Sequence, residues 1–358
     1  MREHLPLSQF PSTESLTVGL NTVFHNEGSA SRGVKILARQ PNRFKSTFAS
    51  EIVTCRLAEN GTLRVFCKYG TKDFDQGYGH RGGVSYEAAV YRKVLAPLHI
   101  SAPGFYGAYR EKRSGQTWLL IEYLEGASQD VSKTNEAVIH AARWIGRFHA
   151  ANEKRLSTTG LGFLRRYDAS YYAGWARRTN QLFGNRRSEL PWLPRLCSRF
   201  EELIPDLLRA RKTVIHGEYY PSNIVYRAGT SRPADWQSAA VAVGQIDLAA
   251  LTQNWPRQMV GRMVKEYKQT RWPKGEPDNF DWLFRIANVY MVLRWLGDPG
   301  VASPAIIRSI FSRRTRHLSV GSRILVRKYR RFLDSLDSQR ENRWGSCDRS
   351  PKTELGLG

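Results

Sequence analysis

The chain lacks closely spaced cysteines, a long apolar run and an apolar N-terminal segment. Its four cysteines are scattered along 358 residues, at Cys55, Cys67, Cys197 and Cys347. No pair has the spacing of a zinc site or a redox motif, so we expect reduced thiols rather than a disulfide framework. No apolar run is long enough to span a bilayer, and the first residues have no signal-peptide core. These absences predict a soluble protein of the cytoplasm.

Acidic residues are scarce relative to basic ones. The sequence has 32 Asp and Glu against 55 Lys and Arg, a formal net charge of +23. Such a charge suits nucleic acid, an anionic membrane surface or an anionic substrate. The basic residues are spread along the whole chain, which favours a solvated basic surface over a dedicated interface. The sequence indicates no oligomeric state.

The most basic stretch begins at Ala305. A helix there would place Leu325, Tyr329, Phe332 and Leu336 on one face, with arginines and lysines around them. A helix with a solvated basic face is the favoured interpretation. Binding of nucleic acid or another anionic surface is the alternative, and such binding weakens steeply as salt rises.

The pattern along the chain changes from strands to helices. Residues 1–40 have weak periodicity, and we expect a loosely attached arm. Strand patterns dominate residues 41–126, and helical patterns dominate residues 127–338. Residues 339–358 are polar, and we expect them to be disordered. The sequence therefore predicts an α+β fold, with a small β-rich N-lobe and a larger helical C-lobe.

Local sequence patterns predict several strands and helices of these two lobes. Residues 51–70 alternate in polarity around Asn60-Gly61, a strong hairpin signal. A helix then follows and stops at Pro97, and a second strand pair ends near Ile121. Residues 135–150 have the period of a helix with one apolar face.

One short span combines a carboxylate, an amide and a second carboxylate. It reads HGEYYPSNIVY, with Glu218 and Asn223, and DWQSA follows, beginning at Asp235. A turn at Ala228-Gly229 between two short strands would bring Asn223 beside Asp235. Two oxygen ligands without a full cage suit Mg²⁺, which keeps several waters and takes phosphate oxygens for the rest. A further carboxylate on the loop can accept a proton from a hydroxyl, which is the layout that phosphoryl transfer requires.

These motifs resemble those of the aminoglycoside phosphotransferase and choline kinase family, the small-molecule branch of the protein-kinase-like fold. HGEYYPSNI is similar to that family's catalytic loop, and DWQSAAVAVGQIDLAAL is similar to its metal-binding segment. The resemblance runs from about Glu51 to the helices near residue 300. It implies a bilobal protein-kinase-like fold that binds ATP and Mg²⁺ between its lobes. It also implies transfer of the γ-phosphate to a hydroxyl of a small molecule, with Glu218 as the base.

The resemblance also implies roles for residues of the N-lobe. Lys68, at the end of the strand RVFCK, resembles the lysine that holds the α- and β-phosphates. Glu87 resembles its ion-pair partner, although Glu111 and Glu122 also lie nearby in sequence. Glu122 to Leu124 resembles the hinge, whose backbone groups would pair with the adenine edge.

Two aspartates compete for the metal. The hairpin spacing from Asn223 favours Asp235, and Asp247 resembles the family's second aspartate. That second aspartate caps the following helix and braces the catalytic loop. We interpret His216 as a hydrogen-bonded scaffold residue and His149 as a buried histidine rather than a ligand.

Glu218 departs from the family pattern, because aspartate is most often found at this position. One added methylene moves the carboxylate by roughly 1 Å, which can cost on the order of 10²-fold in rate. Either the loop has shifted to accommodate the longer side chain, or the site survives as a catalytically silent nucleotide-binding module. The presence of Lys68, Asn223 and Asp235 favours the first interpretation. Gln237 is a second departure, since it replaces a common glutamate.

The nucleotide-covering loop and the acceptor are less defined. Residues 28–53, where the nucleotide-covering loop is expected, contain no G-x-G-x-x-G. If residues 46–50 form this loop, the hydroxyls of Ser46, Thr47 and Ser50 would hold phosphates. Polycationic acceptors such as aminoglycosides need acidic and aromatic walls. The low acidic content argues against them and leaves a neutral or anionic hydroxyl compound as the alternative. A site without acidic side chains beside Glu218 would exclude an aminoglycoside.

Overall fold

A computed structural model describes most of the chain between residues 10 and 298. The described ranges are 10–26, 33–42, 48–57, 61–70, 80–125, 131, 134–157, 160–184 and 191–298. The expected basic helix from Ala305, the expected tail from residue 339, and Ser46 and Thr47 lie outside them. The chain divides into two compact units, one of residues 1–169 and 206–288 and one of residues 170–205 and 289–358. These units differ from the two lobes expected from the sequence, and every described site residue lies in the first unit.

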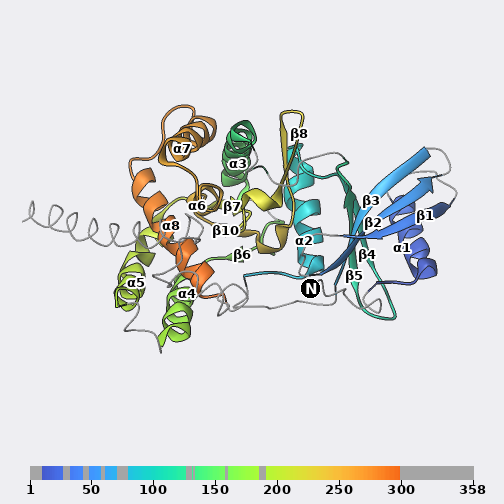
Figure 1. The fold of residues 1–358 in the computed structure, drawn as a ribbon, viewed down its shortest axis with the longest axis horizontal. Coiled ribbons are helices and arrows are strands. Elements are labelled where there is room, and N and C mark those ends of the chain that lie inside the picture. Colours follow the sequence, from blue (N-terminus) through green and yellow to red (C-terminus); the bar gives the residue numbers. More distant parts are fainter. Residues whose placement is uncertain are drawn as a thin grey trace, which may run out of the picture. The chain divides into compact units, whose positions relative to one another are not determined.

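The N-terminal part of the first unit is a five-stranded antiparallel sheet (Figure 1). Its order is β1-β2-β3-β5-β4, with bounds β1 Val34–Pro41, β2 Ala49–Leu57, β3 Gly61–Gly70, β4 Phe105–Arg110 and β5 Thr117–Glu122. Leu57 pairs with Gly61 across β2 and β3, which confirms the expected hairpin. The second expected strand pair is β4 and β5.

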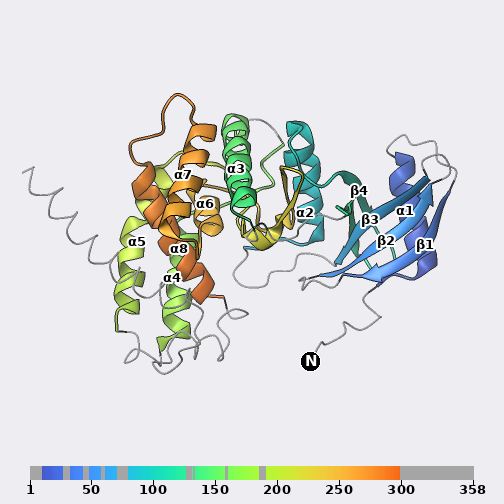
Figure 2. The ribbon, with the colours of Figure 1, turned by 45° about the horizontal axis from the view of Figure 1, so that its top comes forward.

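The two faces of this sheet carry different chemistry, because successive side chains along a strand alternate between faces. Cys67 and Tyr69 of β3 face the core shared with α1 (Thr13–Asn26). Lys68 lies between them and points to the opposite face, where it meets a side chain of α2 (Val84–Val90). Figure 2 shows α1 and α2 on the two sides of the sheet.

The expectation of a loosely attached arm is corrected by the structure. Helix α1 buries Leu16, Leu20, Val23 and Phe24 against the sheet, and β1 forms the sheet's edge. These four residues recur at helical spacing, so they form one apolar stripe that needs a partner surface.

The connection between the two strand pairs is helical. Helix α2 continues into a π-helical turn over Tyr91–Leu95 and a 3₁₀ turn over Ala96–Leu98. The helix expected before Pro97 is therefore present, with a tighter final turn. Gly83 precedes the first turn of α2.

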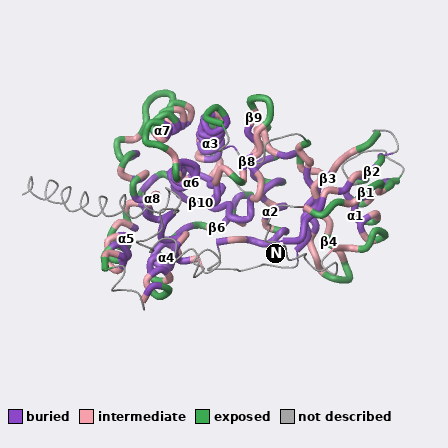
Figure 3. Tube along the Cα trace, viewed as in Figure 1, coloured by how far each residue is buried: buried purple, intermediate pink, exposed green. Residues whose placement is uncertain are grey.

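Helices and short strands form the rest of the first unit. The helices are α3 Asn135–Arg155, α6 Gln245–Leu251 and α7 Arg257–Arg271. A three-stranded sheet has the order β6-β10-β7, with β6 Arg165–Arg166, β10 Ala240–Ala242 and β7 Thr213–Ile215. Strands β8 Ile224–Arg227 and β9 Thr230–Pro233 form a hairpin, flanked by 3₁₀ turns at Pro221–Asn223 and Trp236–Ser238. Figure 3 shows that α6, β7 and β10 are buried.

The remaining helices contribute to the second unit. They are α4 Ala169–Leu182, α5 Leu193–Arg209 and α8 Phe280–Leu296, the last two shared between units. Tyr172, Phe200 and Tyr290 pack their rings together, with centroids 5.3 to 6.5 Å apart. Among the described residues, no helix is both long and apolar enough to cross a membrane.

Leu20→Ala tests whether α1 belongs to the core. Leu20 is fully buried, so its truncation leaves a cavity and should lower the free energy of unfolding by about 2–5 kcal/mol. The control is Val18→Ala on the same helix, where the side chain is 56% exposed and the expected change is within about 0.5 kcal/mol. Urea unfolding curves measure both. Equally small effects would mean that α1 is a dispensable arm.

Candidate functional site

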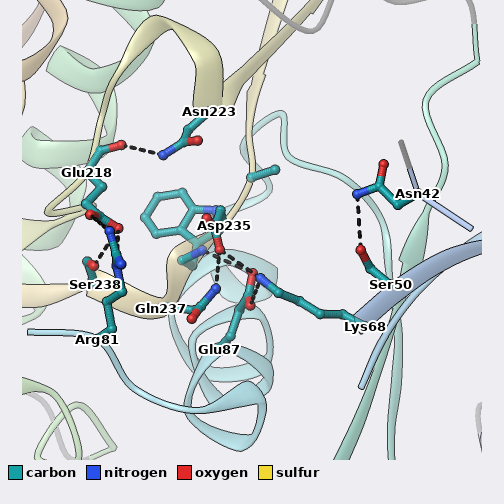
Figure 4. Close-up of polar contacts among 12 residues, drawn as sticks. Asn42, Ser50, Lys68, Arg81, Glu87, Glu218, Asn223, Asp235, Gln237 and Ser238 are labelled. Atoms are coloured by element: carbon teal, nitrogen blue, oxygen red, sulfur yellow. Dashed lines mark hydrogen bonds and ion pairs between the residues drawn. The ribbon is translucent and has the colours of Figure 1, made fainter. Parts of the chain in front are cut away.

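A buried ion-pair cluster joins the sheet, α2 and the segment that follows β9 (Figure 4). The Nζ atom of Lys68 lies 2.7 Å from Glu87 Oε2 and 2.7 Å from Asp235 Oδ1. The side chains of Lys68 and Glu87 are almost fully buried, whereas that of Asp235 is 41% exposed. Lys68 is thus a fixed point charge, and its partner is Glu87 rather than Glu111 or Glu122.

The cluster sets the protonation of its members. Burial acts to lower the pKa of Lys68, but Asp235 and Glu87 outweigh it and raise that pKa above its ordinary value. Burial raises the pKa of Glu87, and Lys68 offsets this only in part. Burial would also raise the pKa of Asp235, but Lys68 and a hydrogen bond from Gln237 hold it below its ordinary value. Asp235 is therefore the ionised and partly exposed carboxylate of the cluster.

The β8–β9 hairpin positions Asp235 as the sequence spacing predicts. Ala228 and Gly229 make the turn, both with positive φ, and the Ala234 N–H donates to the Asn223 carbonyl at 2.9 Å. Asp235 itself has φ 65° and ψ 62°, a left-handed conformation that costs a residue with a Cβ about 1–3 kcal/mol. Such strain is often found at functional sites, where the surrounding contacts hold it.

Asn223 has an oriented amide. Its Nδ2 donates to the Glu218 carbonyl at 2.9 Å, so its Oδ1 points away from that carbonyl (Figure 4). Together with the Asp235 carboxylate, this amide supplies two oxygen donors, a set that suits Mg²⁺ completed by water and phosphate oxygens. In the described part of the chain, no group of three or more His, Cys, Asp or Glu side chains could hold a metal. The amide of Gln237 donates to Asp235 Oδ1, a contact that an ionised glutamate would not make.

Asp247 holds the catalytic loop through backbone groups. Its Oδ2 accepts from the His216 N–H at 2.7 Å, and its Oδ1 accepts from the Gly217 N–H at 2.8 Å. Gly217 has φ 82°, and a Cβ there would lie 2.2 Å from the Ser238 carbonyl oxygen. Asp247 does not cap a helix beginning at Leu248, because α6 already begins at Gln245. Its side chain is therefore directed to the loop instead.

His216 lies in the scaffold of the same loop. Its Nε2 lies 2.9 Å from the Ala234 carbonyl oxygen, and its Nδ1 accepts from the Glu218 N–H at 3.3 Å. Both ring nitrogens thus contact backbone groups on the two sides of the site. This geometry agrees with the interpretation of His216 as a scaffold residue.

His149 of α3 supports Asp247 from behind. Its Nε2 lies 3.1 Å from Asp247 Oδ2, and its Nδ1 lies 2.9 Å from the Tyr267 hydroxyl. Arg271 donates to that hydroxyl and also contacts Glu153 at 3.0 Å. Burial lowers the pKa of His149 from 6.5 to about 4, despite the nearby Asp247. The imidazole is therefore neutral near pH 7.

This buried histidine should make stability depend on pH. As the pH falls below 6.5, His149 becomes protonated in the unfolded chain. In the folded protein it stays neutral until the pH reaches about 4. The free energy of unfolding should therefore fall as pH decreases through this window, by up to about 1.4 kcal/mol per pH unit. Urea unfolding between pH 7 and pH 4 measures the slope.

The matched variants lie on one helix. His149→Gln should flatten the slope, whereas His140→Gln, which removes a partly exposed histidine of α3, should leave it as in the wild type. Identical slopes in all three proteins would contradict the assignment to His149.

The partners of Glu218 are not predicted from the sequence. The carboxylate is buried, and Arg81 contacts it at two points, Nη2 to Oε1 at 2.7 Å and Nε to Oε2 at 3.3 Å. The Ser238 hydroxyl donates to Oε2 at 2.9 Å, and His80 Nε2 lies 3.7 Å from Oε1. No local spacing in the sequence links Arg81 to Glu218, which lies 137 residues further along the chain.

The hinge residues are only partly available for a ligand. The Glu122 N–H donates to the Gly104 carbonyl at 2.7 Å, and the Tyr123 N–H donates to the Arg64 carbonyl at 3.4 Å. The Glu122 carboxylate contacts Arg232 at 3.3 Å. An adenine contact through the Glu122 N–H is therefore excluded in this conformation, whereas one through Leu124 stays a prediction.

Ser50 does not offer its hydroxyl as expected for a phosphate loop. It is buried, and its Oγ accepts from Asn42 Nδ2 at 3.1 Å. The Asn42 N–H also donates to the Ser50 carbonyl at 2.8 Å. These contacts join the ends of β1 and β2.

A comparison with protein-family models matches residues 72–283 to the phosphotransferase enzyme family. The chain belongs to this family. The match includes both motifs that carry the resemblance, the catalytic loop and the metal-binding segment, and the α+β protein-kinase-like fold is confirmed. A comparison with curated protein sequences found no match.

Solved structures of this kind share the fold at low sequence identity. A putative aminoglycoside phosphotransferase from Ralstonia eutropha JMP134 has a TM-score of 0.57 and 13% identity, over 83% of this chain and 93% of that one. The choline kinase LicA from Streptococcus pneumoniae has a TM-score of 0.51 and 12% identity, over 79% and 92%. A macrolide 2'-phosphotransferase from Brachybacterium faecium has a TM-score of 0.51 and 16% identity, over 80% and 94%.

Proposed function

We propose that the protein transfers the γ-phosphate of ATP to a hydroxyl group of a small molecule, with Mg²⁺ as its metal. The observation that carries this proposal is Lys68, held 2.7 Å from both Glu87 and Asp235. Membership of a phosphotransferase family supports the reaction type. A spectinomycin phosphotransferase of similar fold, with a TM-score of 0.53, was solved with ADP and its antibiotic, which supports the nucleotide.

Each residue has a role that follows from its contacts. Lys68 would bind phosphate oxygens, because its ammonium is fixed and charged. Asn223 and Asp235 would hold Mg²⁺, which supplies charge neutralisation at the phosphates. Glu218 would accept the proton of the acceptor hydroxyl. Positioning and charge stabilisation contribute most of the rate in phosphoryl transfer, so a glutamate in place of the usual aspartate is compatible with activity.

The acceptor proposed here is neutral or anionic rather than an aminoglycoside. The contacts described for the Glu218 carboxylate come from Arg81, His80 and Ser238, which are basic or hydroxylic. The nearby Asp235 is already paired with Lys68. A polycation would meet guanidinium and ammonium groups here rather than acidic walls. We also propose that the protein acts in the cytoplasm.

A catalytically silent nucleotide-binding module is the second candidate. The observation that favours it is the pairing of Glu218 with Arg81, which engages both carboxylate oxygens. In this interpretation the lysine cluster binds nucleotide, and the glutamate has only a structural role.

Mg²⁺-dependent stabilisation by ATP tests the nucleotide site. A ligand that binds only the folded protein stabilises it by about 2.7 kcal/mol at a hundredfold excess over Kd. The Tm of the wild type should therefore rise with ATP and Mg²⁺ together, and Asp235→Ala should lose most of this shift. Asp281→Ala, which removes an exposed carboxylate of α8, is the control and should keep it. No shift in the wild type would contradict the proposal.

Glu218→Gln separates the two candidate functions. The amide keeps the size of the side chain but accepts a proton far less readily, so turnover of ATP should fall by about 10²-fold or more. The Mg²⁺-ATP shift in Tm should remain, because Lys68 and Asp235 are unchanged. Unchanged turnover would show that Glu218 is not the base. A wild type that binds Mg²⁺-ATP without any turnover would favour the silent module.

A further inference from the structure

The guanidinium group of Arg81 makes a two-point contact with the carboxylate of Glu218. Nη2 and Nε contact the two carboxylate oxygens at 2.7 and 3.3 Å (Figure 4). Planar guanidinium and carboxylate groups that meet at two points fix orientation as well as charge. The Ser238 hydroxyl adds a third contact at 2.9 Å. The longer glutamate side chain is thereby held in one orientation rather than left to rotate.

The segment that carries Arg81 is itself fixed to the metal-binding segment. The Gly82 N–H donates to the Gln237 carbonyl at 2.7 Å. A Cβ on Gly82 would lie 2.5 Å from the Tyr86 ring, so the close approach requires glycine here. The Tyr86 hydroxyl donates to the Ala239 carbonyl. The residues that directly follow Arg81 are therefore fixed by backbone and ring contacts, and they place Arg81 beside the metal-binding segment.

The segment from Arg81 to Glu87 provides one charged side chain to the catalytic loop and one to the lysine cluster. Arg81 contacts Glu218, and Glu87, six residues further along the chain, contacts Lys68. The two carboxylates of the site thus each contact a basic side chain, Glu218 that of Arg81 and Asp235 that of Lys68, both at 2.7 Å.

We propose that Arg81 is a positioning residue that makes a glutamate usable in this catalytic loop. By its two-point contact it holds the carboxylate, one methylene longer than the family's usual aspartate, in the orientation that the reaction needs. This inference rests on the proposed function of Glu218. Arg81 acts through Glu218, and its removal should lower kcat while leaving KM for ATP nearly unchanged.

A double-mutant cycle at positions 81 and 218 tests the proposal. Hydrolysis of Mg²⁺-ATP, with water as the acceptor, provides turnover without a known acceptor. In the Glu218 background, Arg81→Gln should lower kcat by about 10²-fold, the cost of a misplacement near 1 Å. In the Glu218→Asp background the same change should cost less than about threefold, because the shorter carboxylate does not depend on Arg81. Arg81→Lys, which keeps the charge but not the fork, should be intermediate.

Controls separate positioning from folding. Each variant is measured for Tm and for its Mg²⁺-ATP shift, which Arg81→Gln should retain. Arg143→Gln breaks another 2.7 Å arginine–glutamate pair, with Glu266 between α3 and α7, and should leave kcat unchanged. If Arg81→Gln does not fold, Arg81→Lys replaces it in the double-mutant cycle. The criterion stays the same: the loss of kcat should be larger in the Glu218 background than in the Glu218→Asp background.

The outcomes distinguish this proposal from the proposed function. Equal losses in both backgrounds would show that Arg81 supports the fold and not Glu218, and would overturn the proposal. Higher turnover in Arg81→Gln would also overturn it, since Arg81 would then be an inhibitory contact. A wild type that shows neither Mg²⁺-ATP binding nor hydrolysis would instead refute the proposed function, and the assignment of Arg81 would fail with it.

Discussion

The site depends on one buried lysine that needs two carboxylates. An ammonium taken out of water is costly unless it is paired and hydrogen-bonded, and Lys68 obtains both from Glu87 and Asp235 at 2.7 Å. This requirement connects strand β3, helix α2 and the turn after β9. The alternation of side chains along β3 directs Lys68 away from the α1 core. The Trp236 N–H also donates to Glu87 Oε1 at 3.1 Å, so the same glutamate holds the strained residue Asp235 in its place.

A second charge pair extends this arrangement to the catalytic loop. Arg81 and Glu218 form a second pair of a buried carboxylate with a basic side chain. Both pairs involve the short segment from Arg81 to Glu87, which leads into and begins α2. The catalytic loop is then fixed from the other side by Asp247, which binds two backbone N–H groups and is supported by His149. The loop is held between these two supports, so a longer acidic side chain can occupy a defined position.

The parts predicted from the sequence are those that depend on local spacing. The β2–β3 hairpin, the turn at Ala228-Gly229 and the proximity of Asn223 to Asp235 follow from alternation and turn residues. Arg81 could not be found in this way, because its partner lies 137 residues further along the chain. The packing of α1 was missed for a related reason: its apolar stripe has meaning only against a sheet surface built by later strands.

Binding of Mn²⁺ in place of Mg²⁺ tests most directly whether the lysine cluster is the nucleotide and metal site. Electron paramagnetic resonance measures the fraction of Mn²⁺ that is bound to protein with ADP present and absent. In the wild type we expect protein-bound Mn²⁺ that requires ADP. We expect a strong loss of this binding in Asp235→Asn and no loss in Asp281→Asn. Equal Mn²⁺-ADP binding by the wild type and Asp235→Asn would contradict the assignment of Asp235 as the metal ligand and, with it, the proposed chemistry of the cluster.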